Sequence, residues 1–534
     1  MNRSIVGGKP PAAVSAGARR HARVIARPAG VAAIGALLYL ATPTADYFWD
    51  GITFALQIEK VAGGERSAAL LFHQSHLLYN AAGFLLYWSL NAVGLHARAL
   101  TLLQAANALL SAAALAVFFS AARRVTRDLY RAFTCTAALA VFATWWKLAT
   151  DADAYIPAIL LVLLCLRELL AARPRWFVAG LALAGAMLMH ELAALFSFAA
   201  VALVFSSRGI RAKWRFAAGL LGLAWALSVA AYYACAAALH GMTTPSGVVA
   251  WATTNPSRIT PSLDLLRGLR LSPRANFDLI VGHSFRLFFQ EAGLRMWLIA
   301  LAACVAIATL VWKLIAIWAD RERRTDWSRL RSESGRRWLL VLAAWVIPYV
   351  AFLCCFEPED ANLRMFYAPA LALVFGLACG RRGQHLIDDT GPALMGLATL
   401  RAGVLAVAAL GLFNLAFFIA PHMGADASLL IKEARGAQTR WSERSLILYL
   451  DHNEIDTAFE YFNRQSRWQR LAQGQTDAIE RIKADLMSGE DVWLNGGALD
   501  AIPPERLAGF ARGDEIDVGL AYGSQRYVEL RLRP

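Results

Sequence analysis

Acidic residues stand at the ends of several apolar stretches of this sequence. Two of them, Asp46 and Asp50, follow the first apolar stretch in TADYFWDG, on either side of three aromatic residues. A carboxylate placed where apolar neighbours begin, but where water still reaches it, has a raised pKa and works well as a general base. The other acids of this kind are Asp151 and Asp153 in TDADAY, Glu191 beside His190 in MLMHEL, and Glu357, Glu359 and Asp360 in FEPEDANLR. The pattern predicts acid–base chemistry at one surface of the molecule.

Acids also collect in loops outside a membrane simply because arginine is excluded from such loops. Asp50 fits this explanation least well, since its turn is lined with rings and closed by Gly51. The rings of Tyr47, Phe48 and Trp49 have two interpretations. At least two of them suit the aromatic belt of a membrane interface, and the alternative is stacking against a sugar or a prenyl chain.

The composition is that of a polytopic membrane protein. The chain has 534 residues, of which 58% are hydrophobic and 17% are charged, with a mean hydropathy of +0.44. Apolar runs of about 17 to 25 residues, long enough to cross a bilayer as helices, recur from residue 29 to residue 420. The net charge of +14 is spread over the connections and forms no patch, which argues against nucleic acid as a partner.

The cysteines support neither a disulfide framework nor a zinc site. All of them lie in apolar segments and none is spaced as CxxC. They are Cys135, Cys165, Cys235, Cys304, Cys354, Cys355 and Cys379. We interpret them as small buried apolar side chains.

Arginine and lysine mark the cytoplasmic connections. If the connections rich in them all lie inside, the chain crosses the membrane about eleven times, within a range of about 10 to 13. The expected spans are about 28–44, 96–120, 132–149, 155–172, 176–190, 192–206, 214–239, 294–318, 338–356, 364–380 and 400–420. Residues 1–28 then form a basic cytoplasmic tail, 29–420 the transmembrane domain, and 421–534 an extracytoplasmic domain. The first span is expected to be a signal anchor of the inner (plasma) membrane rather than a cleaved signal peptide.

Two regions keep alternatives open. Residues 68–95 are apolar enough to cross, but one crossing there would invert part of the charge pattern, so we expect interfacial helices in the first outer loop. A simple span is the alternative. Residues 176–206 are expected as two short spans, with one bent pair or a single long helix as the alternatives.

The tail after Pro421 has the pattern of a small α/β domain. Short apolar runs at 445–450 and 491–495 predict strands, and 476–489 has helical periodicity. Residues 515–532 alternate around a Gly-Ser turn, which predicts a hairpin. Pro503 and Pro504 predict the start of another helix.

The spans carry no charge near their middles, whereas ion-coupled transporters need ionisable groups there. Chemistry at the outer surface on a lipid-anchored reactant therefore fits better than transport. A transporter or lipid flippase with the tail as a binding module remains the alternative, and a scaffold without activity is a third interpretation.

The layout resembles that of the GT-C class of integral-membrane glycosyltransferases, in the protein O-mannosyltransferase and aminoarabinose-transferase branch. The first outer loop of that class carries the catalytic acid, and FWDGITFALQIEKVAGG (48–64) is similar, with Asp50 at the position of the acid. Arg98 in LHARAL, the acids of TDADAYIP and Arg364 in NLRMFYAP also match the class. HQSHLLY (73–79) stands where the class has a Pro-Pro-Leu-aromatic motif, so His73 and His76 have no assigned counterpart.

The resemblance implies a sugar on a polyprenyl phosphate as donor and a hydroxyl on a lipid, glycan or protein as acceptor. Asp50 is then the base of an inverting transfer, with Asp46 as the alternative base. Arg364 and Arg98, with His73 and His76, would bind the donor phosphate. The groups that would position the acceptor or hold a divalent metal are Asp151, Asp153, Glu191 and His190. No cofactor is assigned, since some branches of the class use a metal and others do not.

Overall fold

The computed structural model describes most of the chain. The described residues are 27–207, 210–253, 264–282, 297–298, 300–305, 307–309, 333–378, 397–424, 428–436, 441–449, 454–471, 478–520 and 523–533. Residues 1–26 of the predicted cytoplasmic tail lie outside them. The same is true of most of the predicted span 294–318 and of most of the basic connections 319–337 and 381–401.

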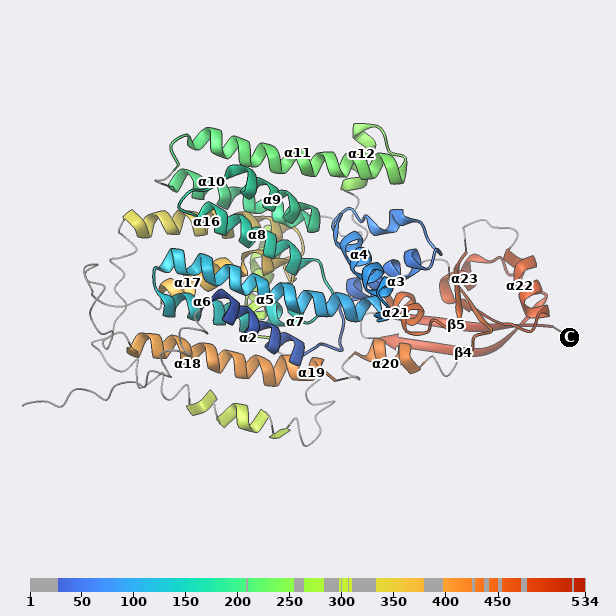
Figure 1. Ribbon diagram of the computed structural model, residues 1–534. Helices are drawn as coiled ribbons and strands as arrows, with labels where there is room; N and C mark the ends of the chain where they lie inside the picture. Colours follow the sequence, from blue (N-terminus) through green and yellow to red (C-terminus); the bar gives the residue numbers. More distant parts are fainter. Residues whose placement is uncertain are drawn as a thin grey trace, which may run out of the picture.

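The larger part of the chain is a bundle of helices that pack on a continuous apolar core (Figure 1). Its helices are α2 (Pro28–Ala41), α5 (Ala99–Thr126), α6 (Leu129–Val141), α7 (Ala143–Ala149), α8 (Tyr155–Leu169), α9 (Trp176–Met189), α10 (Phe196–Ser206), α11 (Lys213–His240), α16 (Glu333–Cys355), α17 (Ala368–Ala378) and α18 (Leu397–Asn414). Shorter elements at their ends are η2 (Glu191–Leu195), α12 (Pro245–Ala252), α13 (Leu265–Ile280), η5 (Leu363–Tyr367), η6 (Leu415–Ile419) and α19 (Ala420–His422).

These helices are those of an integral membrane protein, as predicted. Within the described residues, four helices are long and apolar enough to cross a membrane, and a fifth crossing results if α6 and α7, bent by 70°, form one span. Five shorter apolar helices accompany them. The number of about eleven spans stays a prediction.

Residues 176–206 form two helices that reverse direction at His190. Trp176, at the start of α9, packs over Gly219 near the start of α11. Phe205, near the end of α10, has its ring centroid 4.5 Å from that of Trp214, also near the start of α11. Since both contacts lie at the same end of α11, α9 and α10 run antiparallel. The alternative of a single long helix is therefore wrong.

The segment after α2 forms a separate layer at one end of the bundle (Figure 1). It contains α3 (Trp49–Ala62), η1 (Ala68–Leu71) and α4 (Tyr79–Ala92). Helix α4 packs on α3 and on the start of α5, because Gly83 allows it to approach Ile58 and Leu103. Asn80 Nδ2 donates to Gln57 Oε1 at 2.7 Å. Residues 79–92 thus lie beside α3, between the bundle and the C-terminal domain.

The C-terminal domain is a five-stranded sheet in the order β2-β1-β3-β5-β4 with helices packed on it. Its elements are α20 (Leu429–Gly436), β1 (Ser445–Tyr449), α21 (Glu454–Phe462), β2 (Arg467–Arg470), α22 (Ala478–Met487), β3 (Asp491–Asn495), α23 (Gly496–Ala501), β4 (Phe510–Leu520) and β5 (Gly523–Leu532). Strands β1, β2 and β3 are parallel, whereas β4 and β5 form an antiparallel hairpin. The predicted strands, the helix within 476–489 and the hairpin are confirmed. The predicted helix start at Pro503 and Pro504 is wrong, since a turn follows them.

A buried carboxylate joins this domain to the bundle. The side chain of Glu59, near the end of α3, is 0% exposed. It accepts hydrogen bonds from the Arg98 side chain at 3.0 Å and from the backbone N–H of Ala99 at 2.7 Å. From α21 and the turn after it, Tyr461 Oη donates to Glu59 at 3.3 Å and Arg464 forms an ion pair with it at 2.8 Å. We call these groups the Glu59 cluster.

Candidate functional site

Several connections meet at the end of the bundle that faces α3. Ala45 N donates to the carbonyl of His422 at 2.7 Å, which joins the α2–α3 loop to the end of α19. Gln104 of α5 donates to the carbonyls of Thr44 at 2.8 Å and Thr150 at 2.7 Å. Because one amide bridges two loops, the loop containing Asp46 and the loop containing Asp151 are held side by side.

Asp50 lies in the first turn of α3, where the helix dipole favours a negative charge. The next residue brings this turn onto the loop between α7 and α8. A Cβ at Gly51 would lie closer than 3.0 Å to the carbonyl oxygen of Ala152. Only glycine permits this approach, and it places Asp50 beside the loop that contains Asp153.

Asp151 is fully buried and has several hydrogen-bond partners. Its Oδ2 accepts from Lys147 Nζ at 2.7 Å and from the backbone N–H of Phe48 at 3.0 Å. Its Oδ1 accepts from the N–H of Ala152 at 2.8 Å. A carboxylate held by a lysine and two backbone donors stabilises the loops it joins. Its predicted role toward an acceptor or a metal stays a prediction.

Asp153 is also fully buried, but with a different set of partners. Its Oδ1 accepts from the N–H of Ala154 at 2.5 Å, whereas its Oδ2 has no hydrogen-bond partner among the described residues. Burial, together with the charges of Asp50 and Asp151, raises the pKa of Asp153 well above its usual range. The raised pKa favours the neutral form of this group, which can donate a hydrogen bond.

A second pair of carboxyl groups approaches from the loop between α16 and η5. Burial, the charge of Asp360 and a hydrogen bond with it raise the pKa of Glu357 to about 7, and Asp50 also contributes. Burial raises the pKa of Asp360, opposed by hydrogen bonds that include one from the N–H of Asn362 at 2.6 Å. Glu357 adopts φ = 49°, a left-handed conformation that is unusual for a residue other than glycine.

Three histidines continue from this acid cluster as a row of contacting rings. The ring centroid of Tyr155 lies 4.8 Å from that of His190, which lies 4.6 Å from that of His76. The ring centroid of His73 lies 5.8 Å from that of His76. Burial lowers the pKa of His73, and burial lowers that of His76 well below its usual range. These two imidazoles are neutral, so they can donate or accept hydrogen bonds without adding charge.

Arg364 is fully buried at the start of η5. One terminal nitrogen donates to Tyr367 Oη at 2.9 Å, and the other donates to Ser272 Oγ at 3.0 Å and to the Pro358 carbonyl at 2.6 Å. Its Nε has no hydrogen-bond partner among the described residues. These contacts are all with neutral groups, and the positive charge lies close enough to Asp360 to lower its pKa.

The other predicted site residues lie at the margins of this arrangement. Asp46 Oδ2 lies 3.3 Å from His422 Nε2. Glu191 is exposed, and its backbone N–H donates to the carbonyl of Ser75 at 3.2 Å. Arg98 belongs to the Glu59 cluster, near the opposite end of α3 from Asp50. Among the described residues, no three His, Cys, Asp or Glu side chains are arranged to hold a metal ion.

Glu357, Asp360 and Tyr155 were not assigned from the sequence. The two acids were visible in FEPEDANLR, but nothing in that stretch shows that it folds against Asp50. Tyr155 directly follows TDADA, and that position was the only available signal.

No protein-family model matches the chain, and no curated protein matches its sequence. The fold is similar to solved structures of one enzyme. ArnT from Cupriavidus metallidurans in the apo state gives a TM-score of 0.57 at 12% identity, covering 96% of this chain and 98% of ArnT. ArnT bound to undecaprenyl phosphate gives a TM-score of 0.54 at 12% identity, covering 94% and 97%. ArnT is a GT-C aminoarabinose transferase, so the resemblance of this chain to the GT-C class is confirmed at the level of the fold.

Proposed function

We propose that this chain is a membrane glycosyltransferase that moves a sugar from a polyprenyl phosphate to an acceptor hydroxyl. The observation that carries the proposal is the convergence of Asp50, Asp153, Glu357 and Asp360 from three separate segments of the chain. The likeness to a structure of ArnT bound to undecaprenyl phosphate supports the donor class. The acceptor is a lipid, a glycan or a protein.

Asp50 is the proposed base. Asp151 is occupied by Lys147 and two backbone donors, and the surroundings of Asp153 favour its neutral form. Asp46, the alternative base, lies at the margin of the cluster, beside His422. Asp50 would take the proton of the acceptor hydroxyl while the hydroxyl oxygen of the acceptor forms a bond to the anomeric carbon. The bond from that carbon to the phosphate oxygen breaks, and the phosphate leaves with the electron pair from the opposite face, which inverts the configuration.

Arg364 is the proposed source of positive charge for the leaving phosphate. Its Nε is buried and without a partner among the described residues, and its other contacts are neutral, so its charge is available to an anion. The ring row of His73, His76 and His190 can supply further hydrogen bonds. Arg98 already pairs with Glu59, so we assign it to the Glu59 cluster instead.

The orientation is part of the proposal. Residues 1–28 lie in the cytoplasm, 29–420 form the transmembrane domain and 421–534 the extracytoplasmic domain, as the positive-inside rule predicts. The acid cluster then faces the outer surface, where a donor that moves within the bilayer can reach it.

The test is the release of undecaprenyl phosphate from undecaprenyl-phosphate sugars by the protein in nanodiscs. Asp50→Asn should lower the rate about 10²- to 10⁴-fold, because the general base is lost. Asp46→Asn, a matched change in the same loop, should retain most of the rate. Equal thermal unfolding of the two variants shows that both are folded. Undiminished release by Asp50→Asn would exclude Asp50 as the base.

A further inference from the structure

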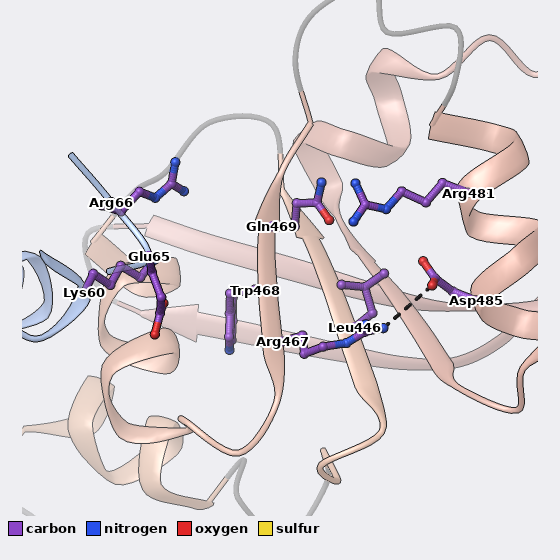
Figure 2. Close-up of a pocket in the computed structure, with 9 residues that line it drawn as sticks. All are labelled: Lys60, Glu65, Arg66, Leu446, Arg467, Trp468, Gln469, Arg481 and Asp485. Atoms are coloured by element: carbon purple, nitrogen blue, oxygen red, sulfur yellow. Dashed lines mark ion pairs between the residues drawn. The ribbon is translucent and has the colours of Figure 1, made fainter. Parts of the chain in front are cut away.

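A cavity lies where the end of α3 meets the sheet of the C-terminal domain, and we call it the junction cavity. Its volume is about 340 Å³, at the lower end of the range of about 300 to 1,000 Å³ for small-molecule sites. It is lined by Lys60, Glu65, Arg66, Leu446, Arg467, Trp468, Gln469, Arg481 and Asp485. Figure 2 shows that these side chains come from the end of α3 and the segment after it, from β1 and β2, and from α22.

Two of the four cations that line the cavity are neutralised by neighbouring carboxylates. Lys60 pairs with Glu460, and Arg467 pairs with Glu490 and, at 3.8 Å, with Asp485.

Arg66 and Arg481 are exposed, and neither forms an ion pair with another residue that the structure describes. In Figure 2 the carboxylate of Glu65 points away from both guanidinium groups. The Gln469 amide faces Arg481. Trp468 and Gln469 are successive residues of β2 and point to opposite faces of it, so Arg66 lies on the Trp468 side and Arg481 on the Gln469 side. The cavity therefore presents two separate guanidinium groups around this edge strand, and each suits one anionic group.

Trp468 gives the same cavity an aromatic wall. Its ring packs edge-on against Trp441 at 5.5 Å, and its Nε1 donates to the carbonyl of Asn463 at 3.3 Å. Both contacts fix the indole in one orientation. A rigid aromatic ring beside cationic groups suits a ligand that has both an apolar face and a negative charge, as a sugar ring with an acidic substituent does.

The cavity exists only while the C-terminal domain is docked on α3. The Lys60–Glu460 pair and the Glu59 cluster hold the two walls together. Lys60 is ten residues after Asp50 on α3, which corresponds to about 15 Å along the helix axis. An extended glycan bound in the cavity can therefore reach the acid cluster with a sugar residue a few units away.

We propose that the junction cavity binds neighbouring acidic sugar residues of an oligosaccharide acceptor. One sugar ring lies against Trp468 with its acid group on Arg66, and the acid group of another residue contacts Arg481 on the other side of β2. Binding energy gained at this distance positions the reacting hydroxyl, as remote contacts do in other enzymes. The identity of the ligand as an acceptor rests on the proposed function, whereas its binding does not.

The test is calorimetric titration of the full chain in phosphatidylcholine nanodiscs with trigalacturonate, with neutral maltotriose as the control ligand. We expect saturable binding of trigalacturonate only. Arg66→Gln and Arg481→Gln should each weaken it about tenfold or more, because each removes a charge-assisted hydrogen bond. Lys483→Gln, on the same helix as Arg481 but outside the cavity, should leave it within twofold. Absence of saturable binding, or equal weakening by all three variants, would overturn the proposal.

Two further measurements separate ligand binding in the cavity from the proposed transfer reaction and from lipid binding. Asp50→Asn should bind trigalacturonate like the unaltered protein while losing transfer. A loss of transfer alone therefore leaves the cavity assignment intact, whereas a loss of binding contradicts it. Nanodiscs containing phosphatidylglycerol should leave the affinity unchanged at high salt. If phosphatidylglycerol competed with trigalacturonate and abolished its binding, Arg66 and Arg481 would bind lipid headgroups instead, and the proposal would be overturned.

Discussion

At the scale of single residues, the acids of this site differ through their surroundings rather than through their chemistry. Asp151 has a lysine and two backbone donors, whereas Asp153 faces other carboxylates without a cation in contact. The first arrangement joins Asp151 to the neighbouring loops, and the second raises the pKa of Asp153 well above its usual range. Two aspartates two residues apart in one loop therefore differ in what they can do.

Glu357 should make donor use depend on pH. Since burial and Asp360 raise its pKa to about 7, the side chain is neutral below that pH and negative above it. The negative form repels the donor phosphate, so kcat/KM for the donor should fall as the pH rises through about 7. Glu357→Gln stays neutral and should remove this fall, whereas the exposed neighbour Glu359→Gln should keep it. A pH profile of Glu357→Gln that matched the unaltered protein would refute this role.

The Asp151–Lys147 pair should dominate the stability of this end of the bundle. Asp151→Asn leaves Lys147 buried without its counter-ion, and such changes cost about 3 to 5 kcal/mol. Glu168→Gln removes the pair with the exposed Arg175 and should cost much less, because water screens that charge. Thermal unfolding in one detergent compares the two variants. Similar shifts in Tm would mean that the buried pair does not stabilise the fold.

At the scale of elements, α3 is the part that positions the site. Asp50 lies in its first turn, Gly51 presses that turn onto the loop of Asp153, and Glu59 fixes its other end. The resemblance to the GT-C class drew attention to this segment and gave Asp50 as its expected reactive residue, a role that stays a prediction. The role of Glu59 could not be predicted, because two of its partners, Tyr461 and Arg464, are some 400 residues away in the chain.

Gly51→Ala should test whether α3 must approach so closely. The added methyl group would overlap the carbonyl of Ala152, so the first turn of α3 has to move. A shift of about 1 Å at a reacting group can cost about a hundredfold in rate, so we expect kcat to fall by roughly ten- to a hundredfold. Gly222→Ala, where no atom lies within 4 Å of the new methyl, should keep full activity. Unchanged kcat in Gly51→Ala would separate this contact from catalysis.

At the scale of the whole molecule, local sequence patterns predicted individual helices and strands better than the contacts between segments that are distant in the chain. Two strands, one helix and the hairpin of the C-terminal domain follow from periodicity. The short strand β2 and the helices α20, α21 and α23 were not predicted, and a turn replaces the helix expected after Pro503. The acids were likewise recognised individually. Glu357 could not be assigned to the same cluster as Asp50, because some 300 residues separate them and only the packing of α16 and η5 brings them together.

Glu59 couples the two parts of the molecule, and Glu59→Gln should loosen the C-terminal domain. The substitution leaves the partly exposed Arg98 and Arg464 close together without their shared carboxylate, so their charges repel each other and the docking contact weakens. Hydrogen exchange should then become faster in α21, which carries Tyr461, while the bundle core remains protected. Glu490→Gln removes an ion pair within the domain and should not change exchange in α21. Transfer and trigalacturonate binding should both fall in Glu59→Gln, because α3 loses one anchor and the junction cavity loses one wall. If α21 exchanged as slowly as before, docking would have to depend on the apolar contacts between α3 and α21 instead.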